Sequence, residues 1–164
     1  MTTFVKHSAL AATVVLAALA CAAPASAAGY VVKISMTETT ADIDLNMKLG
    51  MAMAGDMTKA TMAMKADPAT VPAGQVTFEV NNDSKAVVHE MIVMAIPDAT
   101  KPLPFNTNEN RVDEDKAGDL GEVSELDPGK SGKLVLTLKP GAYLLYCNVP
   151  GHYMSGMWTT FTVK

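Results

Sequence analysis

The sequence predicts an all-β fold, namely a Greek-key antiparallel β-sandwich of seven to eight strands. Short segments that alternate apolar and polar residues are separated by Gly, Pro, Asn and Asp, as expected of strands joined by turns. Several of these segments are rich in β-branched residues. No segment has a helical period of useful length. Seven or eight such strands in one domain favour two packed sheets.

The expected strands can be placed in order along the chain. Alternation is clearest in Gln75 to Asn81, where Val76, Phe78 and Val80 share one face. His89 to Ile96 is a more uniformly apolar strand. The remaining expected strands are Tyr30 to Met36, Lys133 to Lys139, Ala142 to Cys147 and Met157 to Val163.

Turns separate the later strands, and two segments interrupt the pattern. The turns at residues 127–130 and 139–142 each pair a Pro, which fixes φ, with a Gly, which permits unusual φ values. The first interruption is a Met-rich insert at about residues 47–64, with methionines at 47, 51, 53, 57, 62 and 64. The second is a long polar connection from Pro97 to Asp119, with one short helical turn expected at Asp113 to Lys116.

Residues 1–27 have the features of a cleavable export signal peptide. Lys6 gives a basic start, Leu10 to Ala20 is an apolar run of suitable length, and Ala25-Ser26-Ala27 is a cleavage site. The run is too short to span a membrane. We therefore expect export to the periplasm and a single domain at residues 28–164. The alternative is a lipoprotein anchored at Cys21, because Ala18 to Cys21 resembles a lipid-attachment box.

The charge of the chain limits its partners. The full sequence has a formal net charge of −4. Removal of residues 1–27 takes away one basic residue and leaves 12 basic against 17 acidic residues, or −5. This balance argues against nucleic acid as a partner. It permits a basic protein partner attracted over a long range. We expect a monomer.

Beyond the signal peptide, the chain retains one cysteine and two histidines, Cys147, His89 and His152. A lone thiol in an oxidising compartment needs burial or ligation. Cys147 ends an expected strand, His152 follows across a short loop, and Met157 begins the next strand. Thiolate, imidazole and thioether together form the ligand set of a blue-copper electron-transfer centre. Burial of Cys147 as an inert core residue is the alternative.

Three parts of the sequence resemble the cupredoxins, the family that includes plastocyanin and azurin. Residues 143–157 (Tyr-x-x-Tyr-Cys-Asn-Val-Pro-Gly-His-Tyr-Met-Ser-Gly-Met) resemble the C-terminal copper loop of that family. Val88-His89-Glu90 resembles the segment with its first His ligand, and residues 66–80 resemble the strand before it. The resemblance implies one type 1 copper ion with Cys147, His89 and His152 as equatorial ligands and Met157 as axial ligand.

The resemblance also implies the function of the protein. A cupredoxin carries single electrons between redox protein partners and is not an enzyme, and His152 would be the edge through which electrons pass. Many cupredoxins have Asn after the first His, whereas this chain has Glu90. We predict that Glu90 or Asn148 supplies the hydrogen bond that ties the His89 strand to the ligand loop.

Several alternatives remain open in the sequence. Met154 competes with Met157 as axial ligand. The Met-rich insert either packs as ordinary apolar residues or binds Cu(I), and in the second case the protein would serve copper delivery or tolerance. The acidic stretch from Glu109 to Asp127 is either a solvated loop face or a docking site for a basic partner. A structural sandwich without a working copper site is a third functional class.

Enzymatic roles receive little support from the sequence. A Cys-His protease needs the two groups to face each other across a cleft with a third, orienting group. In this chain Cys147 and His152 share one short loop. A multicopper catalytic centre needs more histidines than the two that remain.

Overall fold

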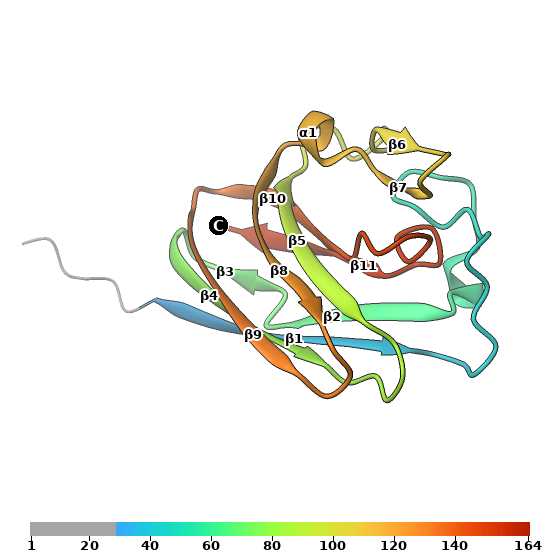
Figure 1. The fold of residues 1–164 in the computed structure, drawn as a ribbon. Helices are drawn as coiled ribbons and strands as arrows, with labels where there is room; N and C mark the ends of the chain where they lie inside the picture. Colours follow the sequence, from blue (N-terminus) through green and yellow to red (C-terminus); the bar gives the residue numbers. More distant parts are fainter. Residues whose placement is uncertain (1–28) are drawn as a thin grey trace, which may run out of the picture.

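The computed structural model describes residues 29–164, which form two sheets packed face to face (Figure 1). The four-stranded sheet has the order β2-β1-β4-β9 and the five-stranded sheet has the order β3-β11-β10-β5-β8. The strands of the first sheet are β1 (Tyr30–Glu38), β2 (Met62–Asp67), β4 (Gly74–Asn82) and β9 (Ser131–Leu138). Those of the second are β3 (Thr70–Val71), β5 (His89–Ala95), β8 (Asp119–Leu126), β10 (Gly141–Tyr146) and β11 (Trp158–Val163).

The predicted β-sandwich is confirmed, with two differences in detail. The pairs β1–β4 and β11–β3 are parallel, whereas the other pairs within the two sheets are antiparallel. The expected strands are all present, and β2, β3 and β8 are additional to them. A small hairpin, β6 (Phe105–Asn106) and β7 (Arg111–Val112), lies in the long polar connection. The same connection contains the expected helical turn as α1 (Glu114–Ala117).

The main core lies between the two sheets. Val32 and Ile34 of β1 and Phe78 of β4 are fully buried there, because alternate residues of each strand point to the same face. Phe161 of β11 meets Phe78 edge to face, with ring centroids 5.4 Å apart. Cys147 belongs to this same cluster, so the candidate metal ligand is in contact with the sandwich core.

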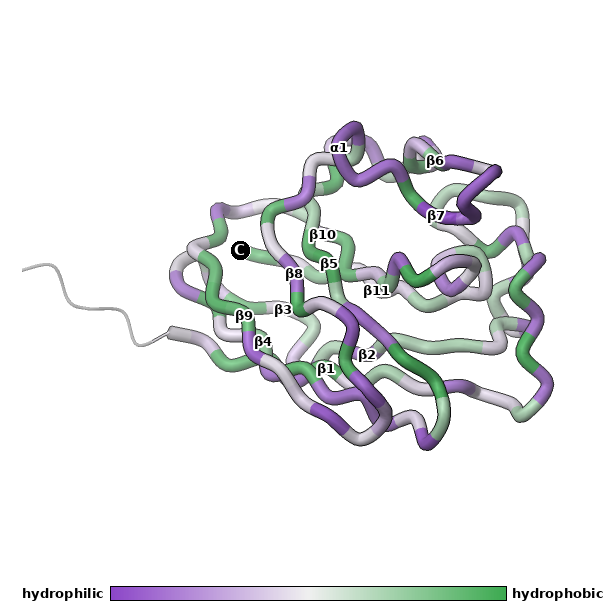
Figure 2. The backbone as a smooth tube through the Cα atoms, in the orientation of Figure 1, coloured by the Kyte–Doolittle hydropathy of each residue, from purple (hydrophilic) through white to green (hydrophobic). Residues whose placement is uncertain are grey.

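Strand β5 is buried on both faces, which explains why its residues 91–95 are all apolar. Met91 and Val93 face the main core, whereas Ile92 and Met94 belong to a second apolar cluster outside the sheet. Residues outside the two main sheets cover this second cluster: Met51, Leu103, Val112, Tyr153 and Met154. The segment with α1, β6 and β7 is hydrophilic over most of its length (Figure 2). Its few apolar side chains are the ones that pack onto the sheet.

Two sequence-based interpretations need correction. The acidic stretch is not entirely loop, because Asp119–Leu126 forms edge strand β8. Its acidic side chains on β8 are exposed, so only the backbone assignment changes. The Met-rich insert is not entirely separate from the sandwich either. Met62 and Met64 lie on β2 and belong to the main core, while Met51 belongs to the second cluster.

The signal peptide at residues 1–27 and lipid attachment at Cys21 lie outside the described residues and stay predictions. Within the described range, no helix has the length and hydrophobicity needed to span a membrane. The start of β5 and the end of β10 lie next to each other, because the two strands pair antiparallel.

Candidate metal centre

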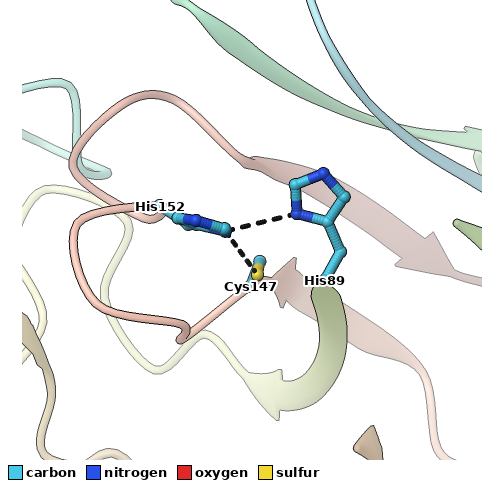
Figure 3. A group of neighbouring side chains, drawn as sticks. All are labelled: His89, Cys147 and His152. Atoms are coloured by element: carbon cyan, nitrogen blue, oxygen red, sulfur yellow. Dashed lines mark hydrogen bonds between the residues drawn. The ribbon is translucent and has the colours of Figure 1, made fainter. Parts of the chain in front are cut away.

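His89, Cys147 and His152 converge at one end of the sandwich (Figure 3). His89 is the first residue of β5, Cys147 directly follows β10, and His152 lies in the loop between β10 and β11. His152 Nδ1 lies 3.2 Å from His89 Nδ1 and 3.3 Å from Cys147 Sγ. One ligand atom from each residue lies within 4.8 Å of the others, and all three side chains are buried. The fold therefore brings together residues that are 63 positions apart in sequence.

The spacing and chemistry of these atoms fit a bound metal ion. Nitrogen ligands lie about 2.0 Å from a small metal ion such as zinc, and thiolate sulfur about 2.3 Å. Ligand atoms just over 3 Å apart are therefore close enough to share one ion. A thiolate with two imidazoles suits copper, because the soft sulfur favours Cu(I) and imidazole suits copper generally. Burial excludes bulk water from the cluster.

The ligand loop is fixed by its own backbone. Gly151 has a φ of +84°, a value that glycine adopts without strain. Met157 N donates to His152 O at 3.1 Å, and Cys147 N donates to Met157 O at 3.0 Å. Ser155 N and Oγ both donate to Gly151 O. These bonds set the positions of Cys147 and His152 independently of any ion.

Burial controls the protonation of the three side chains. Burial, and to a smaller extent the neighbouring His89, together lower the pKa of His152 to about 4. Burial also lowers the pKa of His89, against the opposing effect of Glu38. Both imidazoles are therefore neutral near pH 7 and have a nitrogen lone pair for a metal. Burial raises the pKa of the Cys147 thiol to about 12, so metal binding must release its proton.

Glu90 and Asn148 connect the His89 strand to the ligand loop, as predicted. Asn148 N donates to Glu90 Oε1 at 3.0 Å, and Glu90 N donates to Cys147 Sγ at 3.4 Å. The Asn148 side chain ties the ligand loop to a different strand, β7, because its Oδ1 accepts from Val112 N and its Nδ2 donates to Val112 O. Burial, together with the nearby Glu114 and Glu122, raises the pKa of Glu90 to about 7.

The sequence analysis missed Glu38, which contacts His89 directly. Glu38 Oε1 lies 2.8 Å from His89 Nε2. Burial raises the pKa of Glu38, but hydrogen bonds from Ser84 and His89 outweigh this effect and hold it below its ordinary value. A signal was present in the alternation of β1. Val32, Ile34 and Met36 face the core, so Glu38 at the same parity is an acidic residue on an inward-facing side.

The segment between β1 and β2 covers the ligand loop. Leu49 N donates to Met154 O at 2.9 Å, and Trp158 Nε1 donates to Leu49 O at 2.7 Å. Ser155 Oγ also donates to Asp44 O at 2.6 Å. As a result His152 is only 4% exposed, against 0% for His89. Of the two candidate histidine ligands, His152 is thus slightly closer to the surface, although its ring is still almost fully buried.

The two candidate axial ligands lie in different environments. Met157 is fully buried and belongs to the same core cluster as Cys147. Met154 belongs to the second cluster, on the outer face of the five-stranded sheet, with Tyr153 and Ile92. This difference favours Met157 over Met154.

Comparison with known proteins agrees with the geometry. Residues 51–164 match the family described as copper binding proteins, plastocyanin/azurin family. The chain belongs to this family. A cluster of two His and one Cys in such a protein is consistent with a single type 1 copper site. The cupredoxin match starts after β1, so Glu38 lies outside the matched residues.

Individual relatives point in the same direction. Auracyanin-B of Chloroflexus aurantiacus is 31% identical over 91 residues, which cover 51% of this chain and 39% of that protein. The match therefore spans about two fifths of the relative's length. An auracyanin B structure has a TM-score of 0.50 at 24% identity, covering 82% of this chain and 88% of that one. Rusticyanin from Thiobacillus ferrooxidans has a TM-score of 0.50 at 15% identity, covering 84% and 79%. These structural likenesses concern the fold.

Proposed function

We propose that this cupredoxin carries single electrons between redox protein partners by cycling one copper ion between Cu(II) and Cu(I). In this proposal His89, Cys147 and His152 would hold the copper ion through two imidazole nitrogens and one thiolate, and Met157 would add a weaker thioether ligand. The observation that carries the proposal is the convergence of two imidazoles and one thiol within 4.8 Å in a buried cluster. When bound there, copper supplies a one-electron redox couple that none of these side chains provides alone.

The surroundings of the cluster suit electron transfer better than catalysis on a substrate. The ligand loop is held by backbone hydrogen bonds, and the strand of His89 is tied to it through Glu90 and Asn148. A fixed ligand set changes little in geometry between the two oxidation states, so the barrier to electron transfer is low. Residues 151–157 are all buried, which leaves no opening for a substrate at the ligand loop.

The predicted export signal suggests where the protein works, and its acidic surface suggests the charge of its redox partner. We infer an exported, periplasmic protein from the composition of residues 1–27. Exposed acidic residues continue along edge strand β8 and its flanks, at Glu109, Asp115, Asp119, Glu122, Glu125 and Asp127. This surface would attract a basic redox partner over a Debye length of about 8–10 Å.

The ligand assignment can be tested by adding Cu(II) to the copper-free protein. We expect an intense visible charge-transfer band from thiolate to copper that saturates at one equivalent. Cys147→Ser should abolish the band, because oxygen replaces the sulfur that gives rise to it.

Methionine variants separate the axial candidates. Met157→Leu should change the band and the reduction potential, whereas Met154→Leu, the matched control, should leave both unchanged. A wild-type protein that binds Cu(II) without the band, or an unchanged band in Cys147→Ser, would contradict the proposal.

Electron carriage requires a separate measurement. We expect the reduced protein to transfer its electron to an outer-sphere oxidant in a single second-order phase, with no dependence on dioxygen. A reaction that consumes dioxygen catalytically would instead indicate an oxidase.

A further inference from the structure

Glu38 forms a hydrogen bond from one sheet to a candidate ligand on the other. Glu38 ends β1 in the four-stranded sheet, and His89 begins β5 in the five-stranded sheet. The carboxylate oxygen Oε1 lies 2.8 Å from His89 Nε2. The side chain of Glu38 is 17% exposed and that of His89 is 0% exposed, so water screens this contact weakly.

The contact determines which nitrogen of His89 carries a proton. A carboxylate only accepts hydrogen bonds, so Nε2 must be the protonated nitrogen of the neutral imidazole. The other nitrogen, Nδ1, is then a bare lone pair. Nδ1 is the atom that lies 3.2 Å from His152 Nδ1 within the cluster. Figure 3 draws this contact between the two rings as a dashed line. Glu38 therefore presents the correct atom of His89 to a metal.

The segment that leads to His89 is held by its own hydrogen bonds. Ser84 Oγ accepts from Val87 N at 2.8 Å and from Ala86 N at 3.1 Å. Asn82 Oδ1 accepts from Ser84 N at 3.0 Å, and Asn82 Nδ2 donates to Val87 O at 2.8 Å. The chain between β4 and β5 is thus held in one conformation next to Glu38.

We propose that Glu38 is a positioning residue that fixes His89 in its Nε2–H tautomer and, through its negative charge, lowers the reduction potential of the copper site. The tautomer concerns the protein alone, whereas the effect on the potential rests on the proposed function. A hydrogen-bonded carboxylate makes the ligating imidazole more basic. The more basic imidazole stabilises Cu(II) more than Cu(I), because Cu(II) has the greater charge.

The first test uses copper-free protein, so its result does not depend on copper function. Nitrogen-15 NMR of the histidine rings should show His89 protonated at Nε2 in the wild type and in Glu38→Gln, whose amide oxygen still accepts a hydrogen bond. Glu38→Ala removes the acceptor and should produce a mixture of tautomers. An unchanged tautomer in Glu38→Ala would overturn the positioning role. If that variant does not fold, protonation at Nδ1 in the wild type would overturn it.

The second test measures the reduction potential of the copper-loaded variants. Glu38→Gln keeps the hydrogen bond but removes the charge, so its Cu(II) affinity should fall about 10-fold or more relative to Cu(I). A 10-fold change corresponds to a rise of about 59 mV for a one-electron couple. Glu79→Gln is the matched control, since it removes one negative charge from the same sheet at an exposed pair with Lys133.

The two tests separate the possible failures. A rise in potential in Glu38→Gln no larger than that in Glu79→Gln would overturn the effect on the potential while leaving copper binding intact. A wild-type protein that forms no blue site would contradict the proposed function. In that case the NMR result alone would still decide whether Glu38 sets the tautomer of His89.

Discussion

At the scale of single residues, the site combines groups that are costly to bury with partners that hold them in place. His89 has Glu38 on one ring nitrogen and the ligand cluster at the other. Cys147 Sγ accepts a backbone hydrogen bond from Glu90. Such contacts around the ligands orient them and influence the metal that they bind. The ionised form of the Glu90 side chain is disfavoured, because the side chain is buried near the carboxylates of Glu114 and Glu122.

We predict that Glu90 makes copper-free protein less stable as the pH rises. Its pKa of about 7 lies above the ordinary value of 4.5, so the folded protein binds this proton more tightly than the unfolded chain. The free energy of unfolding therefore falls as pH increases from about 4.5 to about 7. Glu90→Gln removes this loss, so from pH 5 to pH 8 the free energy of unfolding of the variant should change by about 1–3 kcal/mol in the stabilising direction relative to the wild type.

Urea denaturation of both proteins at both pH values checks this prediction. Comparing pH differences cancels any effect of the substitution that does not depend on pH, and the histidines contribute equally to both proteins. Equal pH differences in wild type and Glu90→Gln would show that Glu90 does not titrate in this range.

At the scale of elements, the segment between β1 and β2 acts as a cover on the ligand loop. Its backbone donates one hydrogen bond to Met154 O and accepts hydrogen bonds from Ser155 Oγ and Trp158 Nε1. Leu45 of this segment packs so closely on Gly151 that a Cβ added to Gly151 would lie 2.8 Å from Leu45 Cβ. Gly151 therefore serves both the positive φ of the loop and the close approach of the cover.

A pair of glycine substitutions separates these two roles. Gly151 and Gly118 have nearly the same φ, +84° and +82°, so Ala at either position has a similar backbone strain. A Cβ added to Gly118 would meet nothing within 4 Å, unlike one added to Gly151. Gly118→Ala should cost about 1–2 kcal/mol from its backbone conformation alone. Gly151→Ala should cost about 1–3 kcal/mol more, because of the clash. If urea denaturation showed equal losses in the free energy of unfolding for the two variants, the segment between β1 and β2 would not pack tightly against Gly151.

The same segment allows a prediction about Cu(I). Met51 packs outside the five-stranded sheet, whereas Met62 and Met64 pack between the sheets, so their sulfur atoms do not gather at one point. We expect one equivalent of Cu(I) to bind in a competition titration, and the same stoichiometry after all six methionines of the insert are changed to Leu.

Binding of a second equivalent of Cu(I) would contradict this expectation, and one surface cavity is the candidate place for it. Met57, Met62 and Met64 line a surface cavity of about 620 Å³, and Met57 is 42% exposed. Loss of the second equivalent in Met57→Leu would place a Cu(I) site there and favour the role in copper handling.

At the scale of the whole molecule, charge and fold together define how a partner would approach. The exposed acidic residues of β8 and its flanks lie on an edge strand of the five-stranded sheet. With a net charge of −5 for residues 28–164, long-range attraction favours a basic partner.

This surface predicts a dependence of electron transfer on ionic strength. Oxidation of the reduced protein by a cationic cobalt(III) complex should slow steeply as salt rises, and oxidation by anionic hexacyanoferrate(III) should accelerate. The variant Asp119→Asn/Glu122→Gln/Glu125→Gln should weaken both trends. Glu79→Gln, away from β8, should change them less. Identical salt dependence in all three proteins would exclude β8 as the attracting surface.

Much of the fold could be predicted because alternation and turn residues report directly on strands. The thiolate and imidazole ligands could be predicted because residues 28–164 contain one Cys and two His. β8 was missed because its exposed acidic residues conceal the alternation, with Val123 its one buried side chain. Glu38 was missed because its partner lies 51 residues away on the opposite sheet, a distance that sequence spacing does not reveal. The sequence interpretation of the Met-rich insert relied on its methionine side chains. The structure shows that its backbone also matters, because Leu49 N of the insert donates a hydrogen bond to Met154 O of the ligand loop.

The most direct test of the account is copper K-edge X-ray absorption on the loaded protein in both oxidation states. The account predicts one short sulfur ligand and two imidazole nitrogens in Cu(II) and in Cu(I), with little change in their distances. His89→Gly should reduce the imidazole count from two to one. Two imidazoles in His89→Gly, or loss of the sulfur ligand on reduction, would contradict a fixed site built from His89, Cys147 and His152.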